Sequence, residues 1–268
     1  PRHLRDADMT PGERETCRLY ARLPVFRRRV ERAKAVVRRA LEDHPGRWGV
    51  SCSGGKDSTA TLGVALNAGW RGPVFFFYCA ETPTENARLV EQLARDHGLE
   101  LIAFEVPGAW DVFHQHGRFF LEPETDGEVQ AVRSMLRGYK EVATSTARDA
   151  GLAGLFWGMR RAESKARAVT LSKHGPVYRA DGRNEMTACP LFDWDARDVW
   201  AFLLAEGLPW LERYDDAVVG RDIERSEETW LACGAPWTRS HVGQELRRRD
   251  PARYRELAER WPDLTRYT

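Results

Sequence analysis

The chain has 268 residues, which is enough for one large domain or for one domain with a small appendage. Its hydrophobic fraction of 42% and charged fraction of 30% are ordinary for a globular protein, and a net charge of +1 does not indicate a nucleic-acid-binding protein. No apolar stretch is long enough to span a bilayer, and residues 1–6 lack the apolar core of a signal peptide. We therefore expect a soluble, cytoplasmic protein without membrane contact.

The cysteines and histidines do not form a metal-binding pattern. None of the five cysteines belongs to a CxxC pair, which argues against a zinc knuckle and against a disulfide framework. His114 and His116 lie close to Asp111 in one segment, but the sequence indicates no complete ligand set there. We assign no metal site and expect a reducing compartment.

The first predicted element follows a polar stretch, residues 1–23, which we expect to pack loosely. Residues 24–43 have apolar positions near helical spacing and predict a helix, which His44-Pro45-Gly46 ends. This helix carries one acidic residue before its last turn, Glu31, and many basic ones: Arg27, Arg28, Arg29, Arg32, Lys34, Arg38 and Arg39. The basic face is either a solvated helix surface or a contact surface for an acidic partner or a polyanion such as DNA.

Strands and helices then alternate. Strands are predicted at residues 48–52, 73–79 and 99–106, with helices between them at residues 57–68 and 84–97. This order favours a parallel, doubly wound α/β sheet with helices on both faces.

The later half of the chain is less regular. Residues 108–127 predict an irregular segment, residues 155–157 a short strand, and residues 128–150, 196–206 and 251–260 helices. We expect three parts: an N-terminal helical extension (1–46), a nucleotide-binding domain (47–215) and an irregular C-terminal extension (216–268).

The strongest motif is Ser53-Gly54-Gly55-Lys56-Asp57-Ser58, which directly follows a strand and precedes a helix. A helix N-terminus offers unpaired N–H groups and partial positive charge, so it suits a phosphate group. The two glycines let the backbone approach phosphate oxygens, the serines offer hydroxyl groups, and Lys56 adds a charge. We expect Asp57 to cap the helix. The spacing differs from that of the Walker A motif.

A second motif, Gly158-Met159-Arg160-Arg161-Ala162-Glu163-Ser164-Lys165-Ala166-Arg167, follows the later strand. We expect its four basic side chains to converge at the carboxyl edge of the sheet, where open α/β sheets bind ligands. They are Arg160, Arg161, Lys165 and Arg167. Arginine forks suit phosphate or sulfate, and Glu163 could orient an arginine or help to hold Mg²⁺.

These motifs carry a family resemblance. The 53–58 hexapeptide resembles the PP-loop of the adenine nucleotide α-hydrolase superfamily, whose members bind ATP through its pyrophosphate and break the α–β bond. The resemblance implies a mainly parallel, five-stranded core. Together with Cys189-Pro190-Leu191-Phe192-Asp193-Trp194 and Asp198-Val199-Trp200, the motifs are similar to the branch that contains PAPS reductase, the small subunit of ATP sulfurylase and the ATP pyrophosphatases of DNA phosphorothioation.

The resemblance implies site residues in both motifs. Nucleotide contacts are expected from Ser51, Ser53, Gly54, Gly55, Lys56, Asp57, Ser58, Gly158, Arg160, Ser164 and Arg167. Catalytic roles are expected for Lys56, Asp57, Arg160, Glu163 and Cys233. ATP and Mg²⁺ are the expected cofactors.

Within the branch, the intact loop favours an ATP pyrophosphatase over a sulfonucleotide reductase, whose loop is typically degraded. Ala232-Cys233-Gly234-Ala235-Pro236 also departs from the Glu-Cys-Gly-[Leu/Ile]-His motif of those reductases. We expect ATP activation of an acceptor in sulfur transfer, with DNA phosphorothioation first and a cysteine desulfurase as sulfur donor. The alternatives are a sulfate adenylyltransferase small subunit, a PAPS reductase-like enzyme, or a non-catalytic ATP-binding subunit that needs a partner.

Two cysteines, Cys189 and Cys233, are candidates for carrying sulfur as a persulfide, provided that a lowered pKa keeps a thiolate available. The competing interpretation of each is a buried small hydrophobic residue.

Overall fold

The computed structural model describes residues 11–80, 82–120, 123–180, 184–211, 214, 247 and 251–267. The chain forms two compact units. Unit 1 comprises residues 1–77, 83–104 and 144–216, and unit 2 comprises residues 78–82, 105–143 and 217–268.

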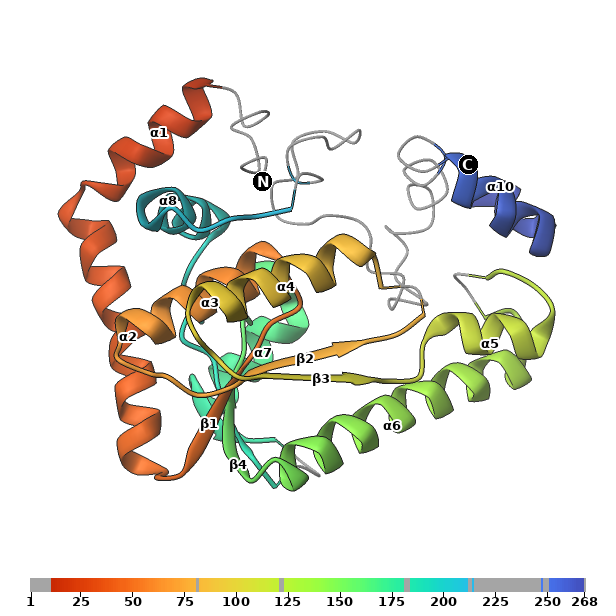
Figure 1. The fold of residues 1–268 in the computed structure, drawn as a ribbon, viewed down its shortest axis with the longest axis horizontal. Helices are drawn as coiled ribbons and strands as arrows, with labels where there is room; N and C mark the ends of the chain where they lie inside the picture. Colours follow the sequence, from red (N-terminus) through yellow and green to blue (C-terminus); the bar gives the residue numbers. More distant parts are fainter. Residues whose placement is uncertain are drawn as a thin grey trace. The chain divides into compact units, whose positions relative to one another are not determined.

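The described part of the chain contains one six-stranded sheet, in the order β3-β2-β1-β4-β6-β5 (Figure 1). Its strands are β1 (Arg47–Ser51), β2 (Val74–Tyr78), β3 (Leu101–Glu105), β4 (Leu152–Phe156), β5 (Val177–Arg179) and β6 (Met186–Ala188). The central strand β1 is parallel to β2 and β4, β4 is parallel to β6, and only the edge strand β5 is paired antiparallel among these pairings. The expected phosphate-binding loop, residues 53–58 (called the phosphate loop below), follows the central strand β1. The candidate site therefore begins at the middle of the sheet.

Helices connect most of these strands along the chain. The described part of unit 1 includes α1 (Pro11–Ala21), α2 (Pro24–Asp43), α3 (Lys56–Asn67), α4 (Thr84–Asp96), the short 3-10 helix η1 (Arg161–Glu163), α7 (Lys165–His174) and α8 (Ala196–Glu206). The parallel strands β1 and β2 are joined through α3 in a βαβ unit, and the mainly parallel sheet with its helices confirms the predicted α/β class. The sheet has six strands rather than the five that the family resemblance implies. Strands β5 and β6 were not predicted because each has only three residues, too few to give a recognisable sequence pattern.

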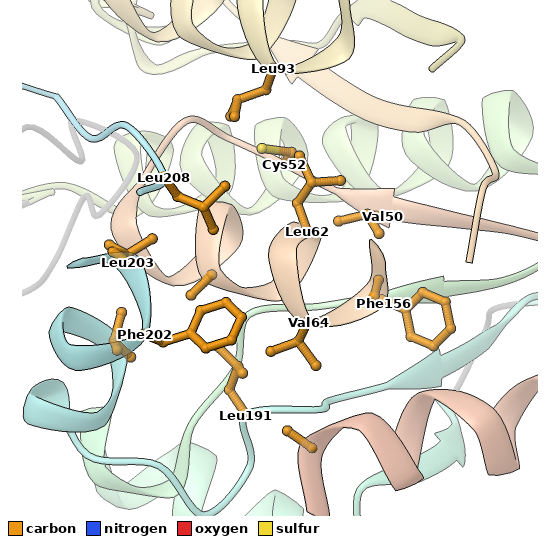
Figure 2. Packing of buried hydrophobic residues seen from close by; sticks show 14 of the residues in the cluster. Val50, Cys52, Leu62, Val64, Leu93, Phe156, Leu191, Phe202, Leu203 and Leu208 are labelled. Carbon is orange, nitrogen blue, oxygen red and sulfur yellow. The ribbon is translucent and has the colours of Figure 1, made fainter. Parts of the chain in front are cut away.

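Helix α3 lies at the centre of the unit 1 core and is buried on nearly all sides. Figure 2 shows Leu62 and Val64 of α3 among apolar side chains that come from β1, β4 and α8. Val50, Leu62, Val64, Phe156 and Phe202 are all fully buried. The packing fixes the position of the helix whose N-terminus carries the phosphate loop.

Residues 11–21 do not pack loosely, contrary to the expectation for residues 1–23, of which residues 1–10 lie outside the described residues. Residues 11–21 form α1, which lies beside α8 (Figure 1). The Tyr20 hydroxyl donates to Asp198 Oδ1 at 2.7 Å, and Arg29 of α2 forms an ion pair with the other oxygen of this fully buried carboxylate. Burial, together with the hydrogen bond to Asp198, raises the pKa of Tyr20 to about 12. The buried hydrogen bond from Tyr20 thus holds α1 against α8, although the sequence of α1 is mostly polar.

Unit 2 contains α5 (Ala109–His116), most of α6 (Asp126–Asp149), α10 (Pro251–Arg260) and the 3-10 helix η3 (Pro262–Tyr267). The prediction that residues 108–127 are irregular was wrong for residues 109–116. Helix α5 buries Val112 and Phe113, and Asp111 accepts a hydrogen bond from Gly108 N–H at 3.0 Å. The helix begins there because the Asp111 carboxylate satisfies an N-terminal donor.

Glu128 organises the start of α6. Its carboxylate, in a residue that is 3% exposed, accepts hydrogen bonds from Arg118 Nε at 2.6 Å and from Glu124 N–H at 2.7 Å. The Arg118 hydrogen bond is the main reason that the pKa of Glu128 is lowered to about 2.

Two further expectations concern the whole chain. Among the described residues, no helix combines the length and apolar character that a membrane crossing requires. The domain limits expected at residues 46 and 215 stay predictions.

Unit 2 is expected to lose stability as the pH falls from about 4.5 towards about 2, because the folded pKa of Glu128 is depressed below its ordinary value. Above a pH of about 4.5, the Arg118–Glu128 ion pair contributes fully to the stability of the folded state. Glu128→Gln should speed amide hydrogen exchange in α6 at neutral pH and remove most of the acid dependence in this interval. Equal acid dependence in the variant and the wild type would contradict the assignment.

Candidate nucleotide site

The loop between β1 and α3 holds its shape through its own side chains. Ser58 Oγ accepts a hydrogen bond from Ser53 N–H at 3.2 Å and donates to Gly55 O at 2.9 Å. Asn86 Nδ2 of α4 donates to Ser53 O at 2.8 Å. Gly54 has a φ of +77°, a conformation that favours glycine. The loop is therefore preorganised at the N-terminus of α3.

Asp57 does not cap α3, contrary to expectation. The N-cap residue is Gly55, which has no side chain that could cap the helix. The Asp57 carboxylate lies instead between two cations: Lys56 Nζ is 2.7 Å from Oδ2, and Arg160 Nε donates to Oδ1 at 2.7 Å. Lys56 and Arg160 are both fully buried. Two positive charges and one negative charge leave one net positive charge beside the phosphate loop.

Within the second motif, Glu163 links Arg160 to Arg167. Glu163 Oε2 accepts a hydrogen bond from Arg160 N–H at 2.9 Å and forms an ion pair with Arg167. Ser164 caps α7 by accepting from Arg167 N–H at 3.2 Å. Arg160 Nη1 also donates to Trp194 O at 3.5 Å. Arg160 thus bridges the phosphate loop, η1 and the segment before α8.

The four basic side chains of the second motif do not all converge. Arg161 turns away from Asp57: its Nη2 donates to Leu171 O at 3.2 Å, and its guanidinium carbon lies 5.2 Å from the centre of the Phe192 ring. Lys165 is exposed on the first turn of α7. The expected convergence therefore applies to Arg160 directly and to Arg167 through Glu163.

Two of the cysteines, Cys52 and Cys189, are buried in the protein interior. Cys52 and Cys189 are 1% and 0% exposed, and burial raises the pKa of both thiols, that of Cys189 to about 12. A thiol with so high a pKa is a poor persulfide carrier, which favours the structural interpretation of Cys189. Cys233 lies outside the described residues.

The histidine segment of α5 has a structural explanation. Asp111 accepts from Gly108 N–H, and His114 Nδ1 lies 3.0 Å from Arg260 Nη2. Within the described ranges, no three His, Cys, Asp or Glu side chains are grouped so that they could hold a metal ion.

Sequence reasoning missed two side chains at the loop. Besides Asn86, Tyr214 contacts it: Lys56 N–H donates to Tyr214 Oη at 3.1 Å. Neither residue belongs to a motif with recognisable spacing. Ser51, by contrast, was expected to contact the nucleotide and is a buried residue of β1, 6% exposed.

Gly158 is required for the close packing of the two motifs. A Cβ at this position would lie 2.9 Å from both the carbonyl carbon and the oxygen of Asp57, and 3.0 Å from Ser58 N. Gly158→Ala should therefore displace the first turn of α3 and weaken binding of the nucleotide that is expected at residues 53–58 by about tenfold or more, as measured by calorimetry. The matched control is Gly12→Ala, whose Cβ would meet nothing within 4 Å. Wild-type affinity in Gly158→Ala would contradict this account.

Comparison with known proteins shows which proteins the chain resembles. The chain is 29% identical over 167 residues to an uncharacterized protein of Methanocaldococcus jannaschii, covering 62% of this chain and 33% of that protein. It is 27% identical over 207 residues to a phosphoadenosine 5'-phosphosulfate reductase of Xanthomonas campestris pv. campestris, covering 74% of this chain and 79% of the relative. The chain thus spans about a third of the first relative and most of the second.

A solved structure shares the fold. The phosphoadenylyl-sulfate reductase of Candida auris, in a phosphate complex, superposes with a TM-score of 0.51 at 17% identity, covering 68% of this chain and 83% of that one. The family model of the phosphoadenosine phosphosulfate reductase domain matches residues 47–220, more than half of the chain. On these grounds the chain belongs to the phosphoadenosine phosphosulfate reductase family.

Proposed function

We propose that the chain binds ATP through its pyrophosphate at residues 53–58 and cleaves it between the α and β phosphates. The observation that carries this proposal is the buried pair Lys56 and Arg160 on either side of Asp57, at the N-terminus of α3. Buried cations and helix N–H groups together form a preorganised environment for negative charge. A site of this kind supports the departure of pyrophosphate.

The reaction would proceed by attack of an acceptor oxygen or sulfur on the α-phosphorus. A bond forms between the acceptor and phosphorus while the bond to the α–β bridging oxygen breaks, and the electron pair leaves with pyrophosphate. Lys56 and Arg160 would stabilise the charge that grows on the bridging oxygen. Glu163 would orient Arg160 through its backbone N–H, and Arg167 would add charge at the more exposed side of the site.

Mg²⁺ fits this site as a companion of ATP rather than as a resident ion. The carboxylates of Asp57 and Glu163 already bind cationic side chains. Phosphate oxygens and water would hold the ion, as is usual for Mg²⁺, and the ion would neutralise charge on the phosphates.

We further propose that the acceptor belongs to sulfur transfer, with DNA phosphorothioation as the first candidate and a cysteine desulfurase as the sulfur donor. The complete loop and the basic helix α2 support this assignment. Cys233 is the remaining candidate persulfide carrier once Cys189 is assigned to the core.

Sulfonucleotide reduction is the second candidate, because family membership and the Xanthomonas relatives favour it. The two functions differ in which residue they need most. A reductase would lose its activity in Cys233→Ser and depend less on Lys56, whereas ATP cleavage has the opposite requirement.

Incubation with Mg²⁺ and α-labelled ATP should release AMP and pyrophosphate rather than ADP. Lys56→Met, which removes the charge but keeps an apolar stem, should lower AMP formation by about a hundredfold or more. Lys34→Met is the matched control, since Lys34 pairs with Glu31 on α2 at 2.6 Å. ADP as product, or full activity in Lys56→Met, would refute the proposal; ATP binding without turnover would indicate a subunit that needs a partner.

The basic helix is proposed to contact DNA through Arg27 and Arg28. Both are exposed and have no ion pair with a described residue, whereas Arg32 pairs with Asp193 at 3.0 Å and Arg39 with Asp43 at 3.0 Å. Arginines that are already paired have less charge to offer a phosphate backbone.

Replacing Arg27 and Arg28 together by Gln should weaken duplex binding and reduce the slope of log K against log salt by about 2, since each phosphate contact contributes about 0.9. Fluorescence anisotropy across a salt series provides the measurement. Arg39→Gln, which removes a charge already paired on the same helix, should change the slope much less. An unaltered slope in the double variant would eliminate this surface as the contact.

A further inference from the structure

The Tyr214 hydroxyl oxygen accepts a hydrogen bond from one of the backbone N–H groups that a bound phosphate group would need. Lys56 N–H, in the first turn of α3, donates to Tyr214 Oη at 3.1 Å, and a Cβ on Gly55 would lie 3.3 Å from the same oxygen. Lys56 N–H is one of the N-terminal donors that have no partner within the helix. A phosphate oxygen bound there and the phenol oxygen would compete for the same hydrogen.

The Tyr214 ring is held by aromatic packing, and its backbone by a hydrogen bond. It packs edge-on against Trp200 of α8, with ring centroids 5.5 Å apart, and its N–H donates to Leu211 O at 3.1 Å. Trp210 packs against the same tryptophan at 5.6 Å, and Leu211 is 3% exposed. The contact with Trp200 of α8 therefore positions the Tyr214 hydroxyl at the loop. Neither Tyr214 nor Trp200 belongs to the 53–58 motif or the 158–167 motif.

The chemistry of the two acceptors differs. A phenol oxygen is neutral and accepts one moderate hydrogen bond, whereas a phosphate oxygen is charged and accepts a stronger one. Phosphate can therefore displace the hydroxyl, but its apparent affinity is reduced by the fraction of molecules in which Tyr214 holds the donor.

We propose that Tyr214 is an internal competitor of the nucleotide phosphates, and that its hydroxyl sets the affinity of the loop for pyrophosphate and ATP. The proposal rests on the proposed function, since it assumes that phosphate binds at residues 53–58. It adds a residue that determines affinity and that neither motif contains.

The test is calorimetric titration with inorganic pyrophosphate and with ATP. Tyr214→Phe keeps the ring on Trp200 and removes only the hydroxyl, so pyrophosphate should bind about three- to tenfold more tightly than to the wild type. Tyr178→Phe, a change in β5 away from the loop, should leave the affinity unaltered. Thermal unfolding of each variant checks that the fold is retained, and Tyr214→Leu provides a second variant without the hydroxyl, in which the affinity should change in the same direction.

Unchanged affinity in folded Tyr214→Phe would overturn the inference, because the hydroxyl would then not compete. Weaker binding would also overturn it, because the hydroxyl would then be a ligand of the phosphate. A wild-type protein that binds neither pyrophosphate nor ATP would instead refute the proposed function, and the inference with it.

Discussion

The Asp57 carboxylate lies between two fully buried cations, and the arrangement of the site depends on it. A buried charge is costly unless it is paired, and the Asp57 carboxylate offsets this cost for Lys56 and Arg160. The same carboxylate joins the N-terminus of α3 to the segment after β4. Gly158 permits this junction, since any larger residue would contact the Asp57 backbone. These three side chains together keep one net positive charge at the N-terminus of α3.

Much of the fold could be predicted because its signals are local. Helices α2, α8 and α10 begin and end where the apolar spacing and the flanking residues predict. Strands β5 and β6 were missed, because three residues give too little periodicity to recognise. Helix α5 was missed since its histidines and aromatic residues obscure a buried face made of Val112 and Phe113. The role of Tyr20 in α1 depends on Asp198, which is distant in sequence.

The site could be predicted in part for the same reason. Lys56 and Arg160 stand in motifs whose residue types suit phosphate, and the structure brings them together at one carboxylate. Their complete burial and the pairing of Asp57 depend on packing between distant segments, which spacing does not report. Arg161 was expected beside Arg160, but its guanidinium binds a carbonyl of α7 instead. Tyr214 reaches the loop only because α8 anchors its ring.

The central claim is that nucleotide phosphates bind at the N-terminus of α3. A crystal structure of the protein with Mg²⁺ and an ATP analogue that cannot be cleaved between its α and β phosphates tests this claim most directly. The account predicts that phosphate oxygens accept hydrogen bonds from the backbone N–H groups of residues 54–57, with Lys56 and Arg160 alongside. A nucleotide bound elsewhere, with these N–H groups unchanged, would contradict it.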